Sequence, residues 1–355
     1  MTELTNSGLF LRRGHDFPVL LLSMDYELFF RRSGSIEKCL FEPTAMLLDF
    51  ANASGVRLTF YIDAGMLCRL AELAPAHMYL QKQLSQVRTD VAKIAAAGHE
   101  IGLHIHPHWE DTRYVRDEWD FSNTRYKLDD FSDSEIRDIV SRYTAELNDL
   151  CDGGVSSYRA GGFCIEPFKR LGGALQEQGI AVDSSVVPGL RIRDPEKGVD
   201  FRQAPEGGWW FFDKSPSIPE TEGEFIEIPV TGQVLPAWHY WRRALARAVG
   251  QRPATVAGDG TPKAIGREEI IRRLTGRGRT SELSVDAPKA GRLNAADISR
   301  TNRRIWHVMG HPKLLGQSSL DALQKFIDRK EIQRFETVAG FADIIRARAS
   351  TSAAI

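Results

Sequence analysis

The chain has 355 residues, of which 42% are hydrophobic and 26% charged, so it has the composition of a globular protein with enough apolar side chains for a large core. Its formal net charge of −1 argues against a dedicated nucleic-acid binder, which would need a basic excess. The four cysteines lie far apart and form no C-x-x-C pair, which argues against a disulfide framework or a cysteine-based zinc site and favours reduced thiols.

The N-terminal residues 1–16 are polar, and we expect them to form a tail outside the folded domain. The apolar run over 17–24 is too short to span a bilayer or to serve as the core of a signal peptide, so we expect a cytoplasmic protein. We expect one domain over 17–345, with an insertion at about 242–303 and a second tail over 346–355.

Strand and helix signals alternate through the first half of the chain. Short apolar runs predict buried strands at 17–24, 56–62, 100–104, 156–159 and 180–183. Apolar residues at helical spacing predict helices at 42–54, 78–97, 132–150 and 166–178. This alternation predicts parallel β-α units, arranged either as a barrel or as a doubly wound sheet. Polar residues at several predicted strand ends favour the barrel, because barrel enzymes take their catalytic groups from the carboxyl ends of the strands.

The second half of the chain is less regular. Strands are predicted at 209–212, 225–230 and 304–309, and helices at 267–274, 318–329 and 337–348. Between Arg242 and Arg304 the sequence holds 15 Lys and Arg against 6 Asp and Glu, an excess of nine positive charges. We expect this basic insertion either to contact an anionic glycan, a lipid-linked phosphate or a membrane surface, or to form a solvated loop. Four tryptophans are expected either to stack on sugar rings or to pack in the core: Trp209, Trp210, Trp238 and Trp241.

The most informative motif is His104-Ile-His106-Pro-His108. Side chains at alternate positions of an extended segment fall on one face, and only nine histidines occur in the chain, so three within five residues is an unusual concentration. Imidazole is the commonest nitrogen ligand of zinc in proteins. We therefore predict a divalent metal site, with zinc as the default ion and nickel, cobalt or manganese as alternatives.

Two carboxylates, Asp25 and Glu27, directly follow the first buried strand. Because they are two residues apart they can share one face, so that one ligates a metal ion while the other acts as a general base. A solvated strand end is the alternative, which the histidine cluster disfavours because clustered imidazole ligands are usually completed by an oxygen ligand.

Three further polar residues lie at or just past predicted strands. Arg159 precedes two glycines, where its planar guanidinium could clamp a carboxylate or lie at the surface before a turn. Asp183 either joins a site or caps a helix. His311 follows the last predicted strand, where an imidazole could protonate a leaving group or belong to an ordinary loop.

Taken in chain order, these segments resemble the polysaccharide deacetylase family, also called the NodB-homology family or carbohydrate esterase family four. The family shows a strand ending in Asp-Asp, a Gly-His-Glu-Ile-Gly segment followed by His-x-x-x-His, an Arg-x-Pro-Tyr segment, an Asp-bearing segment and a late Leu-x-His. The matching segments here, within about 17–315, are Met24-Asp25-Tyr26-Glu27, Gly98 to His108, Arg159 to Phe163, Asp183-Ser-Ser and Met309-Gly-His311.

The resemblance implies a distorted α/β barrel of about seven parallel strands. It also implies a metal-dependent hydrolase that acts on carbon–nitrogen bonds, removing N-acetyl (or O-acetyl) groups from a sugar or polysaccharide precursor. Two histidines of the second motif, His104 and His108, would ligate the metal ion together with an early acid.

The remaining motifs imply the catalytic roles. Asp25 would deprotonate a metal-bound water, and Arg159 would orient Asp25. Asp183 would tune the acid histidine, and His311 would protonate the departing amine.

The chain departs from the family pattern at three places, one of which is Ile105, where the family has Ser or Thr after the first histidine. Tyr26 stands where the family has its second Asp, so we expect Glu27 to supply that ligand and His106 an additional one. Gly161-Gly162 replace the Pro-Tyr pair. Two other functions stay open: a different metal-dependent amide or phosphoester hydrolase on a barrel, and a catalytically inactive sugar-binding protein of surface-polysaccharide synthesis.

Overall fold

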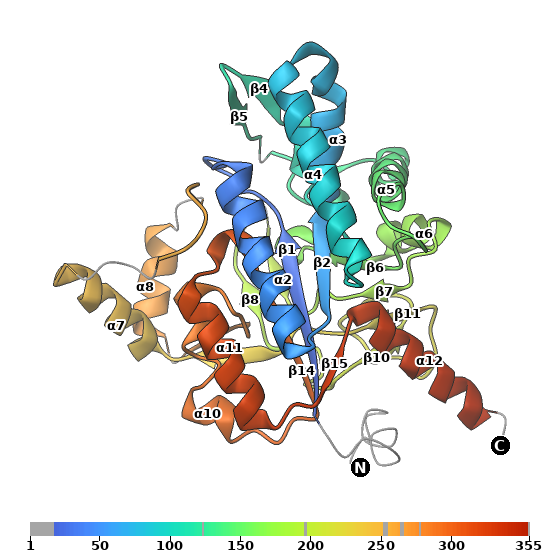
Figure 1. Ribbon diagram of the computed structural model, residues 1–355. Helices are drawn as coiled ribbons and strands as arrows, with labels where there is room; N and C mark the ends of the chain where they lie inside the picture. The colour runs from blue at the N-terminus through green and yellow to red at the C-terminus, as the bar shows by residue number, and fades with distance from the viewer. Residues whose placement is uncertain are drawn as a thin grey trace.

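The computed structural model describes residues 18–122, 124–194, 197–250, 255–262, 266–276 and 278–353 (Figure 1). The predicted N-terminal tail lies outside these residues, as do parts of the basic insertion. Within the part of the chain that the structure describes, no helix combines the length and the apolar character needed to cross a bilayer.

A nine-stranded sheet forms the centre of the molecule. Seven neighbouring strands in it run parallel, in the spatial order β14 (Ile305–Gly310), β1 (Val19–Tyr26), β2 (Leu58–Asp63), β3 (Glu100–Ile105), β6 (Ser157–Ala160), β7 (Val182–Asp183) and β11 (Phe225–Glu227). The short β15 (Arg334–Glu336) pairs in parallel with the start of β1, and β10 (Trp210–Phe212) pairs antiparallel with β11.

Among the described residues, the two edge strands of this parallel set, β14 and β11, are connected through the segments that follow β11 and β13, by the β-bridge of Ser284 with Met309 and a few backbone hydrogen bonds. After β11 the chain runs past β14, where the N–H of Thr231 donates to the carbonyl of His307 at 2.9 Å. A later segment continues this contact, since Leu283 N donates to Thr231 O at 2.7 Å and Val285 N donates to Met309 O at 2.9 Å. The result is a distorted barrel of seven parallel strands, which confirms the predicted fold class.

The segment predicted as a basic insertion, about 242–303, belongs in part to the barrel wall. It contains the joining residues 283–285 and strand β13 (Arg279–Glu282), which pairs antiparallel with β12 (Gly232–Leu235). Residues 283–285 therefore lie in the barrel wall, inside the stretch that was predicted as an insertion. Short strands whose partner is distant in sequence carry little periodicity of their own, so the sequence did not mark this part of the wall.

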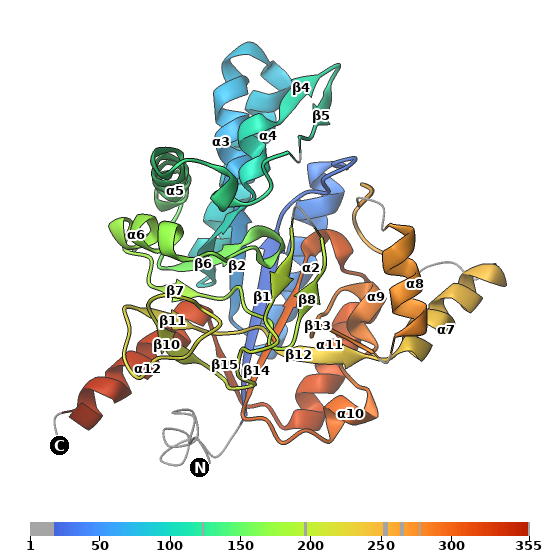
Figure 2. The ribbon, with the colours of Figure 1, turned by 180° about the vertical axis from the view of Figure 1, so that it is seen from behind.

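Helices surround the barrel (Figures 1 and 2): α2 (Glu42–Ser54), α3 (Ala64–Leu73), α4 (Met78–Ala96), α5 (Asp133–Asn148), α6 (Lys169–Glu177), α11 (Gln317–Lys330) and α12 (Val338–Ala353). The hydroxyl of Ser132 accepts the N–H of Glu135 at the start of α5, and Gly55 ends α2 in the left-handed region at φ 66°. Because α12 continues to Ala353, the tail predicted from residue 346 begins inside a helix.

Shorter elements connect these parts. The 3-10 and π turns are η2 (Glu37–Phe41), η3 (Ala74–Ala76), η4 (Pro107–Asp111), η5 (Leu128–Asp130), η6 (Gly161–Phe163) and η7 (Pro312–Leu314). The small strands are β4 (Arg113–Val115), β5 (Glu118–Asp120), β8 (Arg191–Ile192) and β9 (Val199–Asp200). The remaining helices are α7 (Ala237–Ala248), α8 (Arg267–Thr275), α9 (Ala287–Ala290) and α10 (Ala296–Ser299).

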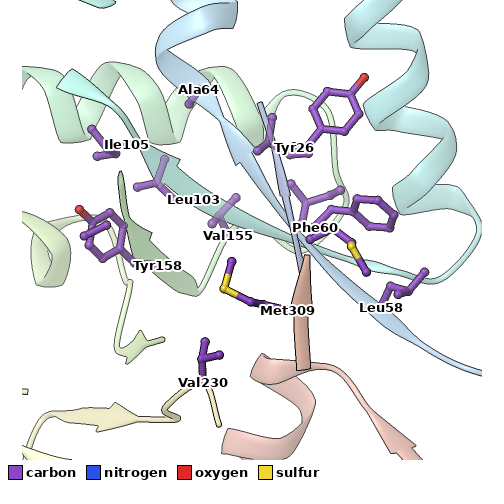
Figure 3. Packing of buried hydrophobic residues seen from close by; sticks show 14 of the residues in the cluster. Tyr26, Leu58, Phe60, Ala64, Leu103, Ile105, Val155, Tyr158, Val230 and Met309 are labelled. Atoms are coloured by element: carbon purple, nitrogen blue, oxygen red, sulfur yellow. The ribbon is translucent and has the colours of Figure 1, made fainter. Parts of the chain in front are cut away.

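Strand β1 is buried on both faces, and alternate side chains belong to different surroundings. Leu20, Leu22 and Met24 belong to the large apolar cluster that includes residues of the helices α2 to α5. Figure 3 shows part of this cluster, with Phe60 and Leu103 from the neighbouring strands β2 and β3. Burial of this face holds the strands and the outer helices together.

The other face of β1 changes from apolar to polar along the strand. Val19 and Leu21 belong to a second apolar cluster, together with residues of α12. Further along, Ser23 hydrogen-bonds the ring of His307 at 2.8 Å, and Asp25 accepts a hydrogen bond from Arg159 at 2.7 Å. The interior is therefore apolar at the amino ends of the strands and polar at their carboxyl ends, which places a polar site at the carboxyl-end rim.

Candidate metal centre and active site

Strand register brings the polar residues to one level of the barrel. Asp63 at the end of β2 pairs with His104 on β3, and His104 pairs with Arg159 on β6. Asp25 on β1 lies opposite Tyr61 of β2, and His311 directly follows β14. Parallel strands end at the same rim, so residues far apart in sequence meet there.

Three side chains at this rim offer ligand atoms for one cation. Glu27, His104 and His106 are buried, and one ligand atom from each lies within 4.8 Å of the other two. Glu27 Oε2 lies 2.6 Å from His106 Nε2 and 3.3 Å from His104 Nε2. Two imidazoles and a carboxylate form a common ligand set for a catalytic zinc ion, which keeps another position for water or substrate.

The orientation of His104 favours a cation at this position. Its Nδ1–H donates to the backbone carbonyl of Arg159 at 2.8 Å, so in the neutral ring Nε2 carries the lone pair. Burial would lower the pKa of His104, but Asp25 and then Glu27 raise it, which favours an imidazolium that donates from Nε2 to Glu27 when no metal ion is bound. A cation between the two side chains would take the place of that proton. The His106 ring fits beside Gly161 because a Cβ on residue 161 would lie 2.5 Å from His106 Nδ1. The residues present therefore fit a divalent ion.

The alternation of β1 explains why Glu27 reaches this site while Tyr26 does not. Tyr26 faces away and donates its hydroxyl to Asp90 of α4 at 2.8 Å. Glu27, two residues after Asp25, lies with it on the inner side. Although Tyr26 stands where the resembling family has its second Asp, Glu27 supplies a carboxylate one residue later.

His108, which we predicted as a metal ligand, lies outside the group formed by Glu27, His104 and His106. Pro107 begins the turn η4, so the alternation that places 104 and 106 on one face ends before 108. The His108 ring is fully buried against Phe30, with centroids 4.5 Å apart. Burial, together with neighbouring His106, lowers the pKa of His108 well below its usual value, so its imidazole is neutral. Of the four predicted ligands, the structure therefore brings Glu27, His104 and His106 together, and the ligand role of His108 stays a prediction.

Asp25 is held by Arg159, as predicted. Arg159 Nη1 donates to Asp25 Oδ1 at 2.7 Å, while its Nε and Nη2 donate to the carbonyl and hydroxyl of Ser184. The guanidinium also lies over the ring of Tyr61, 4.2 Å from its centroid. The other oxygen of Asp25, Oδ2, stays 3.9 Å from both His104 Nε2 and His311 Nε2. One carboxylate oxygen is therefore fixed, and the other faces the reactive groups.

His311 is paired with Asp286, a residue that sequence reasoning missed. Its Nδ1 lies 3.0 Å from Asp286 Oδ2, and its backbone N–H donates to Asp286 Oδ1 at 2.8 Å. Burial alone would lower the pKa of His311, but Asp286, with smaller contributions from Glu27 and Asp25, raises it to about 9. The imidazole is therefore protonated at neutral pH and can donate a proton from Nε2.

Asp183, predicted to tune the acid histidine, takes another position. Its carboxylate accepts from the hydroxyl of Ser185 at 2.7 Å, and it lies against the buried Glu227. The residue that contacts His311 is Asp286. It directly follows residues 283–285, the segment that closes the barrel wall. Asp286 lies within the stretch that the sequence marked as an insertion, so no sequence signal connected it with His311.

Lys313 is a second residue that the sequence did not indicate. Its Nζ lies 2.8 Å from Glu27 Oε1 and donates to the carbonyl of Leu28 at 2.6 Å, and the side chain is buried. Burial alone would raise the pKa of Glu27, but the Lys313 ammonium and then the rings of His106 and His104 hold it well below its usual value. Glu27 is therefore an anion with one oxygen on Lys313 and the other on the histidines.

Asp63 is a third site residue that the sequence analysis did not name, although its position in the sequence could have indicated it. It is an acid at the end of a predicted strand, as Asp25 is. The indole N–H of Trp109 donates to Asp63 Oδ2 at 2.6 Å, and its Oδ1 is buried with no hydrogen-bond partner among the described residues. Burial raises the pKa of Asp63 to about 6, against the opposing effect of His106 and His104.

Comparisons with known proteins give structural matches alone. The chain matches no protein-family model, and no significant match exists among curated proteins. A protein described as a polysaccharide deacetylase from Mycobacterium smegmatis is 15% identical, with 95% of this chain and 93% of that chain covered and a TM-score of 0.42. A family 4 carbohydrate esterase from Streptomyces lividans, in complex with acetate, is 11% identical, with 88% and 87% covered and a TM-score of 0.36.

A CE4 family pseudoenzyme from Bacillus anthracis is 10% identical, with 91% of this chain and 64% of that chain covered and a TM-score of 0.35. All three proteins carry the name of the family that the sequence motifs resemble. Because these TM-scores lie below 0.5, the fold and the site described above rest on the residues of this chain.

Proposed function

We propose that this chain is a metal-dependent hydrolase that removes acetyl groups, from nitrogen or oxygen, on a sugar or polysaccharide precursor. One observation carries the proposal: the side chains of Glu27, His104, His106, Asp25 and His311 come together at one rim of the barrel. The order of the motifs along the chain, which resembles the polysaccharide deacetylases, supports an acetylated sugar as the substrate class.

The ligand set would hold the ion through Glu27, His104 and His106, with zinc the most suitable ion for two imidazoles and a carboxylate. A divalent ion bound there would supply Lewis-acid chemistry, polarising the acetyl carbonyl and lowering the pKa of water. His104 is fixed for this role by its hydrogen bond to the Arg159 carbonyl.

Proton transfer would be divided between Asp25 and His311. Asp25, held at Oδ1 by Arg159, has its Oδ2 directed at the reaction region and accepts the proton of the attacking water. His311, protonated because of Asp286, donates a proton from Nε2 to the departing nitrogen or oxygen. The two groups lie 3.9 Å apart, so both can reach one reacting centre.

The test combines metal content with acetate release. The full chain is dialysed against zinc, its bound metal is measured by mass spectrometry, and acetate release is followed on chitin oligomers, peptidoglycan fragments and acetylated xylan. We expect one zinc per chain and acetate release that a chelator abolishes. His311→Asn should keep the metal and lose 10²- to 10⁴-fold in turnover, the usual contribution of a general acid.

Two controls make the test decisive. His104→Ala/His106→Ala should lose both metal and turnover, whereas His77→Asn, at an exposed histidine, should change neither. Phosphate release with two bound ions would identify a different hydrolase. Stoichiometric zinc without turnover on every acetylated sugar would identify a sugar-binding protein and reject the enzyme.

A further inference from the structure

Helix α7 exposes an apolar stripe to solvent. Trp238, Trp241 and Leu245 are 53%, 49% and 60% exposed, and Val249, just past the helix, is 72% exposed. These residues follow one another at intervals of three or four, so they share one face of the helix. The side that packs inward carries the buried His239 instead. Such an arrangement is the reverse of an ordinary amphipathic helix at a protein surface, whose apolar side faces the core.

The neighbouring helix α8 exposes two further apolar side chains. Ile270 and Ile271 are 45% and 59% exposed. The indole N–H of Trp241 donates to the carbonyl of Leu274 at 2.8 Å, which ties the two helices together. The pair projects from one edge of the molecule, away from α12 (Figures 1 and 2). We call the stripe formed by Trp238, Trp241, Leu245, Val249, Ile270 and Ile271 the α7–α8 face.

Positive charge surrounds the α7–α8 face. The described side chains of the two helices include five arginines against two glutamates. Arg242 borders the stripe, with its guanidinium 5.4 Å from the ring of Trp238. Beside α8 lies a cavity of about 570 Å³, where the single carboxylate of Glu269 is shared by three guanidiniums, those of Arg272, Arg273 and Arg279. The described surroundings of the stripe therefore carry a cationic excess.

We propose that the α7–α8 face is a docking surface for an anionic lipid bilayer. Tryptophans, branched aliphatic side chains and flanking arginines on a short helix are the composition of segments that lie in the bilayer interface. Arginine stems can cover apolar surface while their charged groups reach lipid phosphates. A second copy of the chain fits less well, because isologous pairing of this face would bring two arginine-rich surfaces together.

The test is flotation of the full chain with lipid vesicles. One set contains phosphatidylcholine alone, and the other an equimolar mixture of phosphatidylcholine and phosphatidylglycerol. We expect binding to the anionic set that weakens as salt is added. Trp238→Ser/Leu245→Ser should reduce the partition coefficient at least roughly tenfold. Arg242→Gln should reduce it about fivefold, the value of one basic residue at an anionic surface.

A matched control replaces two exposed apolar residues elsewhere, Met78→Ser/Ile218→Ser, which are 85% and 57% exposed and should leave binding unchanged. Circular dichroism melting confirms that each variant is folded. Absence of binding to anionic vesicles at low salt would overturn the proposal, as would equal binding by Trp238→Ser/Leu245→Ser. A full-chain dimer that this double variant converts to monomer, without vesicle binding, would assign the face to self-association. The proposal does not depend on catalysis, so a chain without turnover would still bind.

Discussion

The ammonium of Lys313 lies 2.8 Å from Oε1 of Glu27, inside the candidate metal site. The two oxygens of this carboxylate therefore have different partners: Oε1 contacts the lysine, and Oε2 contacts His106 and His104. A buried positive charge so close to a ligand fixes the orientation of that ligand and at the same time repels a bound cation. Which of these effects is larger decides how tightly the site holds its metal ion.

We predict that repulsion dominates. Two like charges a few ångströms apart at a partly buried site, here the Lys313 ammonium and a bound zinc ion, repel each other by up to about 4 kcal/mol. Because Lys313→Met removes this repulsion, it should tighten zinc binding at least tenfold. Lys313→Arg keeps the charge and serves as the control, with zinc affinity within about threefold of the parent. Isothermal titration at fixed pH measures both values. Weaker zinc binding by Lys313→Met would instead show that Lys313 acts mainly by positioning Glu27.

The pair of Asp25 and Arg159 should be important for stability as well as catalysis. Arg159 is fully buried, so Arg159→Met leaves an uncompensated carboxylate and should lower the free energy of unfolding by about 3–5 kcal/mol. Adding Asp25→Asn removes that charge and should recover part of the loss. Denaturant titration of the metal-free chain measures both variants.

The control for this pair is an exposed ion pair, Arg137 with Glu177. Arg137→Met should change the free energy of unfolding by less than about 1 kcal/mol. A double variant no more stable than Arg159→Met would show that packing on Tyr61 and bonds to Ser184, rather than the charge pair, account for the loss.

Asp286 should set the titration of His311. Because a nearby anion favours the imidazolium, Asp286→Asn should lower the pKa of His311 from about 9 by roughly one unit or more. The prediction concerns the metal-free chain, in which the ring protons of His311 can be followed by NMR over pH, with His311→Asn identifying the resonance. Asp183→Asn serves as the comparison and should leave this titration in place. If Asp183→Asn lowered the pKa of His311 and Asp286→Asn did not, Asp183 would have the role that the sequence motifs implied.

Glu227 should make the fold less stable as pH rises. Burial, and then the neighbouring Asp183, raise the pKa of Glu227 well above its usual value, so the native state keeps a proton that the unfolded state releases above about pH 4.3. Where the native state binds more protons, the free energy of unfolding falls with increasing pH. The stability contributed by the protonated carboxyl is therefore complete below about pH 4.3 and is lost towards the raised pKa.

The isosteric change Glu227→Gln should remove this loss. Denaturant midpoints at a series of pH values should fall less steeply for Glu227→Gln than for the parent. Glu224→Gln, at an exposed glutamate nearby, is the control and should keep the parental slope. Parallel slopes for Glu227→Gln and the parent would mean that this carboxyl is ionised in the native state.

Local patterns were enough to predict most of the barrel and part of the site. The apolar runs gave the strands β1, β2 and β3, and helix α2 begins and ends as predicted because Gly55 stops it in the left-handed region. Alternation along an extended strand correctly placed Asp25 with Glu27. The same alternation does not extend to His108, because the extended segment ends where Pro107 begins a turn.

The rest depended on contacts between distant segments. Asp286 reaches His311 because residues 283–285 complete the barrel wall, and nothing in the local composition of that basic stretch indicates a strand. Lys313 lies in the turn η7, directly after β14. The pairing of β14 with β1 brings this turn close to Glu27, which follows β1. The expected cytoplasmic location stays a prediction, which fractionation of cells expressing the tagged chain would test.

The central claim is that Glu27, His104 and His106 gather around one cation. The most direct test is an anomalous difference map at the zinc edge from crystals of the full chain soaked in zinc. We predict a single peak about 2.0–2.2 Å from Glu27 Oε2, His104 Nε2 and His106 Nε2, with His108 outside the coordination sphere. A peak on His108, or no peak at this rim while zinc binds elsewhere, would contradict the account.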